Sequence, residues 1–335
     1  MTTATVTTAS PATGPTRTAL PVLAAGVTML LWASAFIAIR AVGEHYSPGA
    51  MALGRLAVGS VVLSLVAAIR RPRIPRGRTL GLLVAYGVAW FALYTVSLNA
   101  AERHLDAGTA ALLVNLGPIL IAVLAGVYLH EGFPRGLVTG IVIAFAGVLT
   151  ITFATSTGER DLTGVLLAVA SAGLYAVGVL LQKRALAGTQ PLPATWLGCL
   201  AGALACLPFA PALVSQAAQA PVSATLGIVY MGVFPTATAF LTWTYALSHT
   251  NAGRLATSSY VVPALAVLLS WLLLGEVPAP LAFVGGALCL VGVAVSRLPA
   301  RTRVGPSRRW AAWRQTLGGP APDVEVDRRP WMARD

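Results

Sequence analysis

Charged residues are scarce in this sequence. Only 10% of its 335 residues are charged, whereas 56% are hydrophobic, and a soluble domain has about 25% charged residues. A chain this apolar cannot cover its own surface with solvated side chains. The composition therefore excludes an ordinary soluble enzyme and favours a protein surrounded by lipid. Spanning helices of about 20 residues each leave room for about ten of them.

Cysteine and histidine are also rare, and neither is placed for a cofactor. The three cysteines, Cys199, Cys206 and Cys289, all lie within apolar runs, so a disulfide framework is not expected. The four histidines share no metal-ligand spacing. The sequence has neither a GxxxxGKS/T loop nor a GxGxxG loop, and therefore no ATP-binding motif. We predict no metal and no cofactor.

The net charge of +12 does not point to nucleic acid as a partner. Its positive residues form short clusters between the apolar runs and in residues 301–335, rather than one basic face. Lys and Arg concentrate on the cytoplasmic side of membrane proteins. With ten spans, all 23 Lys and Arg residues except Arg40, Arg55, Arg103 and Arg160 fall on the side that holds both ends of the chain. We therefore predict a multi-pass protein of the cell membrane with both termini in the cytoplasm.

Ten apolar runs are predicted to be membrane-spanning helices. The first run follows a Thr/Ala/Pro-rich segment, 1–18, and is too long to be the core of a signal peptide. Residues 299–335 are rich in Arg and Pro, and both terminal segments are predicted to be disordered cytoplasmic tails. The ten runs are 20–41, 48–69, 79–100, 107–129, 136–154, 164–182, 193–213, 224–247, 253–274 and 279–297.

The two halves of the chain match each other at a nearly constant spacing. A shift of 145 residues pairs Pro48 with Pro193, Pro118 with Pro263, Glu131 with Glu276, Gly140 with Gly285 and Gly147 with Gly292. A shift of 143 pairs Trp32 with Tyr175 in the first span of each half. We therefore predict an all-α membrane protein with two five-helix repeats, at 19–155 and 163–298.

An odd number of helices in each repeat has a topological consequence. The second copy must enter the membrane from the side opposite to the first, which makes an inverted-topology repeat. Such repeats typically support alternating access around a site at their interface. A duplication without any role in transport is the other interpretation.

An ordered set of residues in both halves resembles a known transporter group. The first span holds Trp32-Ala-Ser34-Ala-Phe36, and the second opens with Pro48 and carries Arg55. The fourth and ninth spans each contain a proline and close with a glutamate, and the fifth and tenth carry spaced glycines. Over residues 20–298 this set resembles the drug/metabolite transporter superfamily, specifically its ten-helix EamA-type members. The resemblance implies a 5+5 inverted bundle that moves small metabolites or drugs, often outward. Tyr175 departs from the tryptophan often found at its position.

Arg55 is the ionisable side chain that lies well inside a predicted span. From a helix start near Ser47 it lies about 12 Å deep. An arginine at the membrane centre costs about 2.5–3.5 kcal/mol and usually faces a cavity or a partner. A structural hydrogen bond or snorkelling to the headgroups is the alternative. At the shift of 145 its counterpart is Leu200, so the fold itself does not demand a charge there.

The other candidate cavity residues are aromatic or uncharged. Tyr86, Trp90 and Tyr94 are spaced i, i+4, i+8 and share one stripe of the third span, which would either face a solute or pack on a neighbouring helix. Pro118 and Pro263 are predicted to kink their helices beside polar groups, as happens where a cavity is lined. The remaining candidates are Trp32, Ser34, Asn115, Tyr175, Trp243, Ser259 and Tyr260.

Acidic residues are expected at helix ends. Glu131 and Glu276 are predicted to anchor the ends of the fourth and ninth spans. Because no Asp or Glu lies mid-span, a buried carboxylate proton relay is not expected. The leading hypothesis is a secondary transporter, not an enzyme, that exports a small organic or amino-acid-like solute. An intramembrane enzyme and a passive channel are the alternatives, and the glycines also leave a homodimer open.

Overall fold

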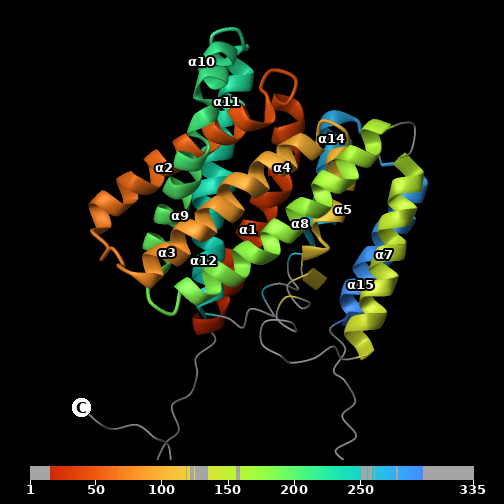
Figure 1. The fold of residues 1–335 in the computed structure, drawn as a ribbon, viewed down its shortest axis with the longest axis horizontal. Coiled ribbons are helices and arrows are strands. Elements are labelled where there is room, and N and C mark those ends of the chain that lie inside the picture. The colour runs from red at the N-terminus through yellow and green to blue at the C-terminus, as the bar shows by residue number, and fades with distance from the viewer. Residues whose placement is uncertain are drawn as a thin grey trace, which may run out of the picture. The chain divides into compact units, whose positions relative to one another are not determined.

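A computed structural model of the protein describes residues 16–117, 119–120, 124, 135–155, 159–249, 255, 259, 261–276 and 278–296. All regular elements in these ranges are helical (Figure 1). The α-helices are α1 (Thr16–Val42), α2 (Pro48–Arg70), α3 (Arg78–Tyr86), α4 (Tyr94–Ala101), α5 (Ala107–Val114), α7 (Arg135–Thr155), α8 (Glu159–Ala185), α9 (Pro191–Ala205), α10 (Ala210–Ala217), α11 (Val222–Met231), α12 (Ala239–His249), α14 (Val261–Leu274) and α15 (Pro280–Ser296). Shorter elements are the π-helices η1 (Gly87–Leu93) and η3 (Gly232–Thr238) and the 3-10 turn η2 (Leu207–Phe209).

Within the described ranges, five helical segments are long and apolar enough to cross a membrane. They are Leu20–Val42, Pro48–Arg70, Arg78–Ala101, Leu162–Ala185 and Val222–His249. A sixth segment, Pro191–Ala217, is bent by 50° where α9 meets η2. Shorter apolar helices lie in α7, α14 and α15. The count of ten spans stays a prediction. Nine of the ten predicted runs coincide with these helices, and the described part of the other run, 107–129, contains α5.

Some predictions fall outside the described residues. These are Pro118, Glu131 and Tyr260, and the terminal segments 1–15 and 299–335. At the described edge, α1 begins at Thr16, inside the segment predicted to be a tail.

Local sequence explains where several helices begin. Pro48 is the first residue of α2 and Pro191 the first of α9, positions at which the missing N–H of proline leaves no helical hydrogen bond unmade. Asp106 caps α5, because its carboxylate accepts a hydrogen bond from the Thr109 backbone N–H at 2.8 Å. Pro263 lies in the first turn of α14, where a proline is tolerated for the same reason. Residues 256–258 and 260, which precede it, lie outside the described residues, so the kink predicted at Pro263 stays a prediction.

A π-helix interrupts the third span of each half at matching positions. The segments η1 and η3 both have seven residues and begin at Gly87 and Gly232, which are separated by the same 145 residues that align the halves in the sequence. Short π-helical segments inside α-helices are frequent at functional sites. The match shows that the repeat extends to an irregular feature of the backbone.

The contacts of these two glycines correct one part of the sequence alignment. A Cβ atom on Gly232 would lie 2.8 Å from the carbonyl oxygen of Arg55, and one on Gly87 would overlap the carbonyl oxygen of Gly198. Gly198 is therefore the counterpart of Arg55, and the pairing of Arg55 with Leu200 was wrong. Equivalent residues of the second helices in the two halves, α2 and α9, are therefore 143 residues apart rather than 145. The first residues of these helices, Pro48 and Pro191, have the same separation. The two-residue difference lies between the second and third helices of each half.

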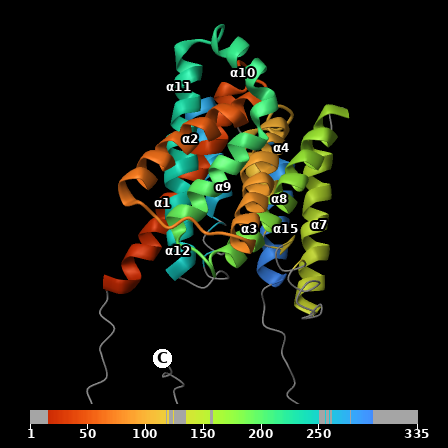
Figure 2. The ribbon, with the colours of Figure 1, turned by 60° about the vertical axis from the view of Figure 1, so that its left-hand side comes forward.

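The fifth and tenth predicted helices, α7 and α15, pack side by side (Figures 1 and 2). A Cβ on Gly147 would lie 2.6 Å from the carbonyl oxygen of Gly285, and a Cβ on Gly292 would lie 2.6 Å from that of Gly140. The two contacts exchange equivalent residues of the two halves, as a two-fold relation requires. These glycines thus allow close helix approach inside the chain.

Candidate functional site

A cavity of about 60 Å³ lies between helices of both halves. Its walls come from α1, α2, η1, α4 and α5 of the first half and from α8, η3, α12 and α14 of the second. The lining residues are Trp32, Ala35, Phe36, Arg55, Leu56, Trp90, Phe91, Tyr94, Thr95, Leu98, Val114, Asn115, Tyr175, Thr236, Phe240, Ser259 and Val262.

Arg55 supplies a charged group to this cavity. Its side chain is 6% exposed, and its Nε donates a hydrogen bond to Oγ1 of Thr236 in η3 at 3.1 Å. A guanidinium has five N–H donors, so Arg55 can offer further donors to a solute in the cavity. The hydrogen bond also links α2 to the second half of the chain, which fixes the direction of the guanidinium.

Aromatic rings from both halves form most of the remaining wall. The ring of Trp90 lies 6.1 Å from that of Trp32, 5.0 Å from that of Tyr175 and 5.1 Å from that of Phe240, centroid to centroid. The contacts of Trp90 with Tyr175 and Phe240 are edge-to-face, and its contact with Trp32 is tilted. Edge-to-face ring pairs stabilise packing beyond the area that they bury. The cavity therefore combines an apolar wall with a cationic group.

Uncharged polar groups complete the lining. Asn115 is 7% exposed, and within the described part of the chain its Oδ1 has no hydrogen-bond partner. Thr95 and Ser259 lie in the same wall. An amide oxygen buried without a partner carries a free-energy cost, which a donor group on a bound solute would relieve.

Most of the candidate residues predicted from the sequence line this cavity. Those in the lining are Trp32, Arg55, Trp90, Tyr94, Asn115, Tyr175 and Ser259. Ser34 lies elsewhere, with its Oγ 2.7 Å from the hydroxyl of Tyr230. Phe91, Thr236 and Phe240 are lining residues that the sequence did not single out, and Phe36, part of the first-span motif, was not among the cavity candidates.

Tyr86 and Trp243 belong instead to a buried group centred on Gln182. The amide nitrogen of Gln182 donates to the hydroxyls of Tyr86 and Thr244, at 2.9 and 3.0 Å. The indole N–H of Trp243 donates to Gln182 Oε1 at 3.2 Å. This group ties α8 to α3 and α12. Gln182 is a single polar residue near the end of an apolar run, and nothing in the sequence indicates that it would join three helices by hydrogen bonds.

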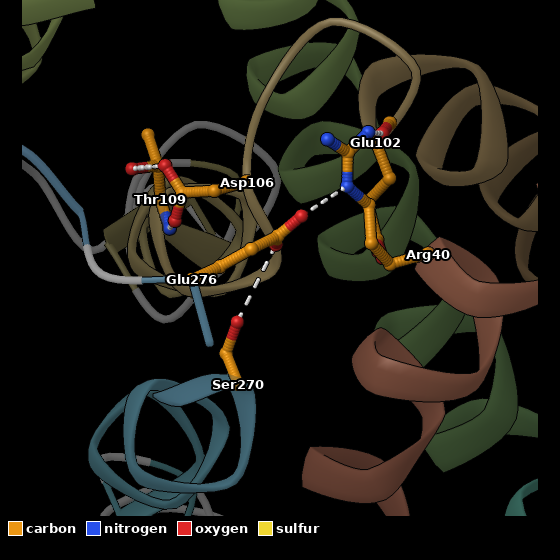
Figure 3. A network of polar contacts seen from close by, with 6 residues as sticks. All are labelled: Arg40, Glu102, Asp106, Thr109, Ser270 and Glu276. Atoms are coloured by element: carbon orange, nitrogen blue, oxygen red, sulfur yellow. Dashed lines mark hydrogen bonds and ion pairs between the residues drawn. The ribbon is translucent and has the colours of Figure 1, made fainter. Parts of the chain in front are cut away.

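A second polar group lies where α1, α4 and α14 end (Figure 3). Arg40 Nε is 2.8 Å from Glu276 Oε1, and Arg40 Nη1 donates to the backbone carbonyl of Glu102 at 3.0 Å. The hydroxyl of Ser270 reaches the other carboxylate oxygen of Glu276 at 3.5 Å. We call Arg40, Glu102, Ser270 and Glu276 the Arg40 cluster. Glu276 thus joins the end of α14 to α1.

No site role was predicted from the sequence for Arg40, Ser270 or Glu102, and Glu102 is the most unexpected of these three. Its side chain is 2% exposed, although it follows the last residue of α4 and would be expected in a solvated turn. A signal was available, because the residue 145 positions later is Leu247, which is also buried. A repeat position that is apolar in one copy indicates burial in both.

Comparison with known proteins identifies the family. The sequence model of the EamA-like transporter family matches residues 19–153 and, a second time, residues 162–298. The first match begins within α1 and the second ends after α15, and the two matches fall on the two halves of the chain. The chain belongs to the EamA-like transporter family.

Relatives of this EamA-like chain are named as transporters. It is 37% identical over 267 residues to a probable terminal-alkyne amino-acid exporter of Streptantibioticus cattleyicolor, covering 80% of this chain and 90% of the relative. It is 35% identical over 270 residues to the uncharacterized transporter YdfC of Bacillus subtilis, covering 80% and 88%. It is 24% identical over 291 residues to a probable amino-acid metabolite efflux pump of Salmonella typhimurium, covering 83% and 94%. The EamA-like chain is therefore a multi-pass membrane transporter of a small molecule.

A solved protein structure has the same fold. It superposes with a TM-score of 0.57 at 22% sequence identity, covering 84% of this chain and 98% of the other. At that identity the likeness concerns the fold of the EamA-like chain alone.

Proposed function

We propose that this protein exports a small, amino-acid-like solute across the cell membrane by alternating access, and that the cavity at Arg55 is its binding site. The observation that carries the proposal is the composition of the cavity wall. Residues of both halves meet around one buried guanidinium, so a relative movement of the halves would change access to a solute bound there.

The chemistry of the wall favours a solute with an anionic head and an apolar body. A guanidinium binds a carboxylate with two parallel hydrogen bonds. The rings of Trp32, Trp90 and Phe240 would bury an apolar side chain. Two relatives named for the export of amino acids or their metabolites support the same class of solute and the outward direction.

The proposal includes ten helices in two inverted repeats, with both termini in the cytoplasm. The distribution of Lys and Arg supports this orientation. The ends of α1, α4 and α14, where the Arg40 cluster lies, then face the outside. The matched π-helices and the exchanged glycine contacts of α7 and α15 support the repeat.

Counterflow in proteoliposomes tests the proposed function. Purified protein is reconstituted, and vesicles preloaded with one unlabelled amino acid are offered the same compound in labelled form. The panel contains apolar and aromatic amino acids, together with the matching amines that lack the carboxylate. We expect saturable accumulation of an apolar amino acid and none of its amine.

The same assay separates the other functions. A passive channel would equilibrate the label without transient accumulation, because it has no alternating site. Absence of saturable exchange for every carboxylate in the panel would contradict the proposed substrate class.

A further inference from the structure

Glu102 is buried, and its carboxylate has no hydrogen bond to the part of the chain that the structure describes. Its side chain is 2% exposed. An ionised carboxylate in such a place is very costly, so a buried carboxyl group of this kind takes up a proton and becomes neutral. The described conformation therefore favours the protonated form of Glu102.

Charged groups of both signs face Glu102 from the surrounding elements. Arg40 on α1 and Arg55 on α2 favour its ionised form, whereas Glu276 after α14 and Asp106 before α5 oppose it. Burial is the largest influence and raises the pKa of Glu102, which lies just outside the spanning segment, well above its usual range. The two arginines reduce this effect without cancelling it.

A second cavity borders Glu102. This cavity has a volume of about 160 Å³ and is lined by Glu102, Arg40, Asn99 and, at its rim, the exposed Glu44 and Arg103. The Oδ1 atom of Asn99 also lacks a partner in the described part of the chain. A polar cavity of this size with several free acceptors can hold water molecules. This cavity would give a proton released from Glu102 a route to the solution once the helices at this end separate.

The Arg40 cluster connects the charge of Glu102 to the contact between the ends of α1, α4 and α14. Arg40 holds Glu276 through its Nε and the Glu102 backbone carbonyl through its Nη1, so one side chain joins α1, α4 and α14. If these helices separate, the carboxyl of Glu102 becomes hydrated and its ionised form is no longer penalised. The resulting carboxylate would then compete with Glu276 for Arg40.

We propose that Glu102 is a proton-binding site, protonated while the end of the bundle at Arg40 is closed and deprotonated when it opens. On opening, the O–H bond of the carboxyl breaks, the proton passes to water in the second cavity, and the carboxylate pairs with Arg40. By linkage, a lower pH on that side stabilises the closed form and a higher pH favours the open form. The inference rests on the proposed alternating access, which supplies the opening.

Infrared spectroscopy of the purified full-length protein, in a detergent that contains no ester or carboxyl group, tests the site without any solute. A protonated carboxylic acid has a carbonyl stretch that an ionised carboxylate lacks. We expect this band at pH 7 in the unmodified protein and its loss in E102Q. E44Q is the matched control, because Glu44 lines the rim of the same cavity but is exposed, and we expect it to keep the band.

A third variant tests the link to closure. E276Q removes the partner of Arg40 and should reduce the band, because the freed Arg40 stabilises an ionised Glu102. Absence of the band in the unmodified protein, or its persistence in E102Q, would overturn the proposal. If E102Q cannot be purified, E102D serves instead, since a shorter acid should shift the band in frequency while an unchanged band would exclude Glu102 as its source. Failure of counterflow would leave all these spectra unaffected, so the two proposals fail separately.

Discussion

Arg55 donates a hydrogen bond from its Nε to the hydroxyl oxygen of Thr236, 3.1 Å away, and so reaches from the second helix of one repeat to the π-helix of the other. The backbone of the same arginine lies against Gly232, the first residue of that π-helix. Arg55 is thus held by main chain and side chain at one point of contact between the halves. A movement of one half against the other would change the direction in which the guanidinium points.

The first prediction concerns this hydrogen bond. T236V keeps the shape of the side chain but removes the acceptor, so the guanidinium loses the group that directs it. We expect a several-fold fall in counterflow at unchanged expression, which corresponds to about 1 kcal/mol. T238V, on the same π-helix with its hydroxyl bonded to the backbone of Val233, is the control. Equal flux in both variants would argue against a directing role for Thr236.

The second prediction concerns the matched glycines of the π-helices. In G87A and G232A the new methyl group would overlap a backbone carbonyl of α9 or α2, which can move only with its helix. We expect each variant to lose about 1–3 kcal/mol of stability, as overpacking does, seen as a lower melting temperature in detergent. G173A on α8 meets no atom within 4 Å and should melt no lower than the unmodified protein. Tolerance of both substitutions would contradict the close contact of these helices.

The third prediction concerns the ion pair of Arg40 and Glu276. The two side chains are 38% and 27% exposed, so their pair should contribute only about 0.2–1 kcal/mol. A double-mutant cycle of R40Q, E276Q and the combined variant, measured by melting temperature, should give a coupling energy in this range. We expect flux to change more than stability, because the pair joins α1 to α14. A coupling energy of zero would indicate that the pair is not formed in the lipid environment.

The fourth prediction concerns topology. A reporter fused after Gly77 should be active in the cytoplasm, and one inserted in the connection 157–163 should be active outside. A reporter found inside at 157–163 would contradict the inverted repeat, because the first five helices would then not cross an odd number of times.

Much of the fold was predictable because apolar length and turn residues mark helix ends directly. The predicted run 48–69, for example, matches α2 (Pro48–Arg70) to within one residue. The π-helices were not predictable, since a change of hydrogen-bond register leaves no mark in composition. The counterpart of Arg55 was misassigned because similar apolar residues at 198 and 200 do not reveal in which loop the two-residue difference lies.

The candidate site was predictable where a residue was chemically unusual for a membrane span. Arg55, Trp90 and Asn115 stand out from their apolar neighbours, and all three line the cavity. Phe91 and Phe240 line it as well, but phenylalanine is equally common in lipid-facing and packed positions. Glu102 was missed because position at a helix end predicts exposure, and its burial results from helices distant in sequence.

Flux and melting temperature of R55L, measured side by side, test the central claim most directly. Removal of the charge relieves an insertion cost of about 2.5–3.5 kcal/mol, so the fold should tolerate the change, while a carboxylate solute loses its main partner. The account predicts a melting temperature at or above that of the unmodified protein and a fall in counterflow of at least about tenfold, or 1.4 kcal/mol. Normal flux at normal stability would contradict a solute site at Arg55.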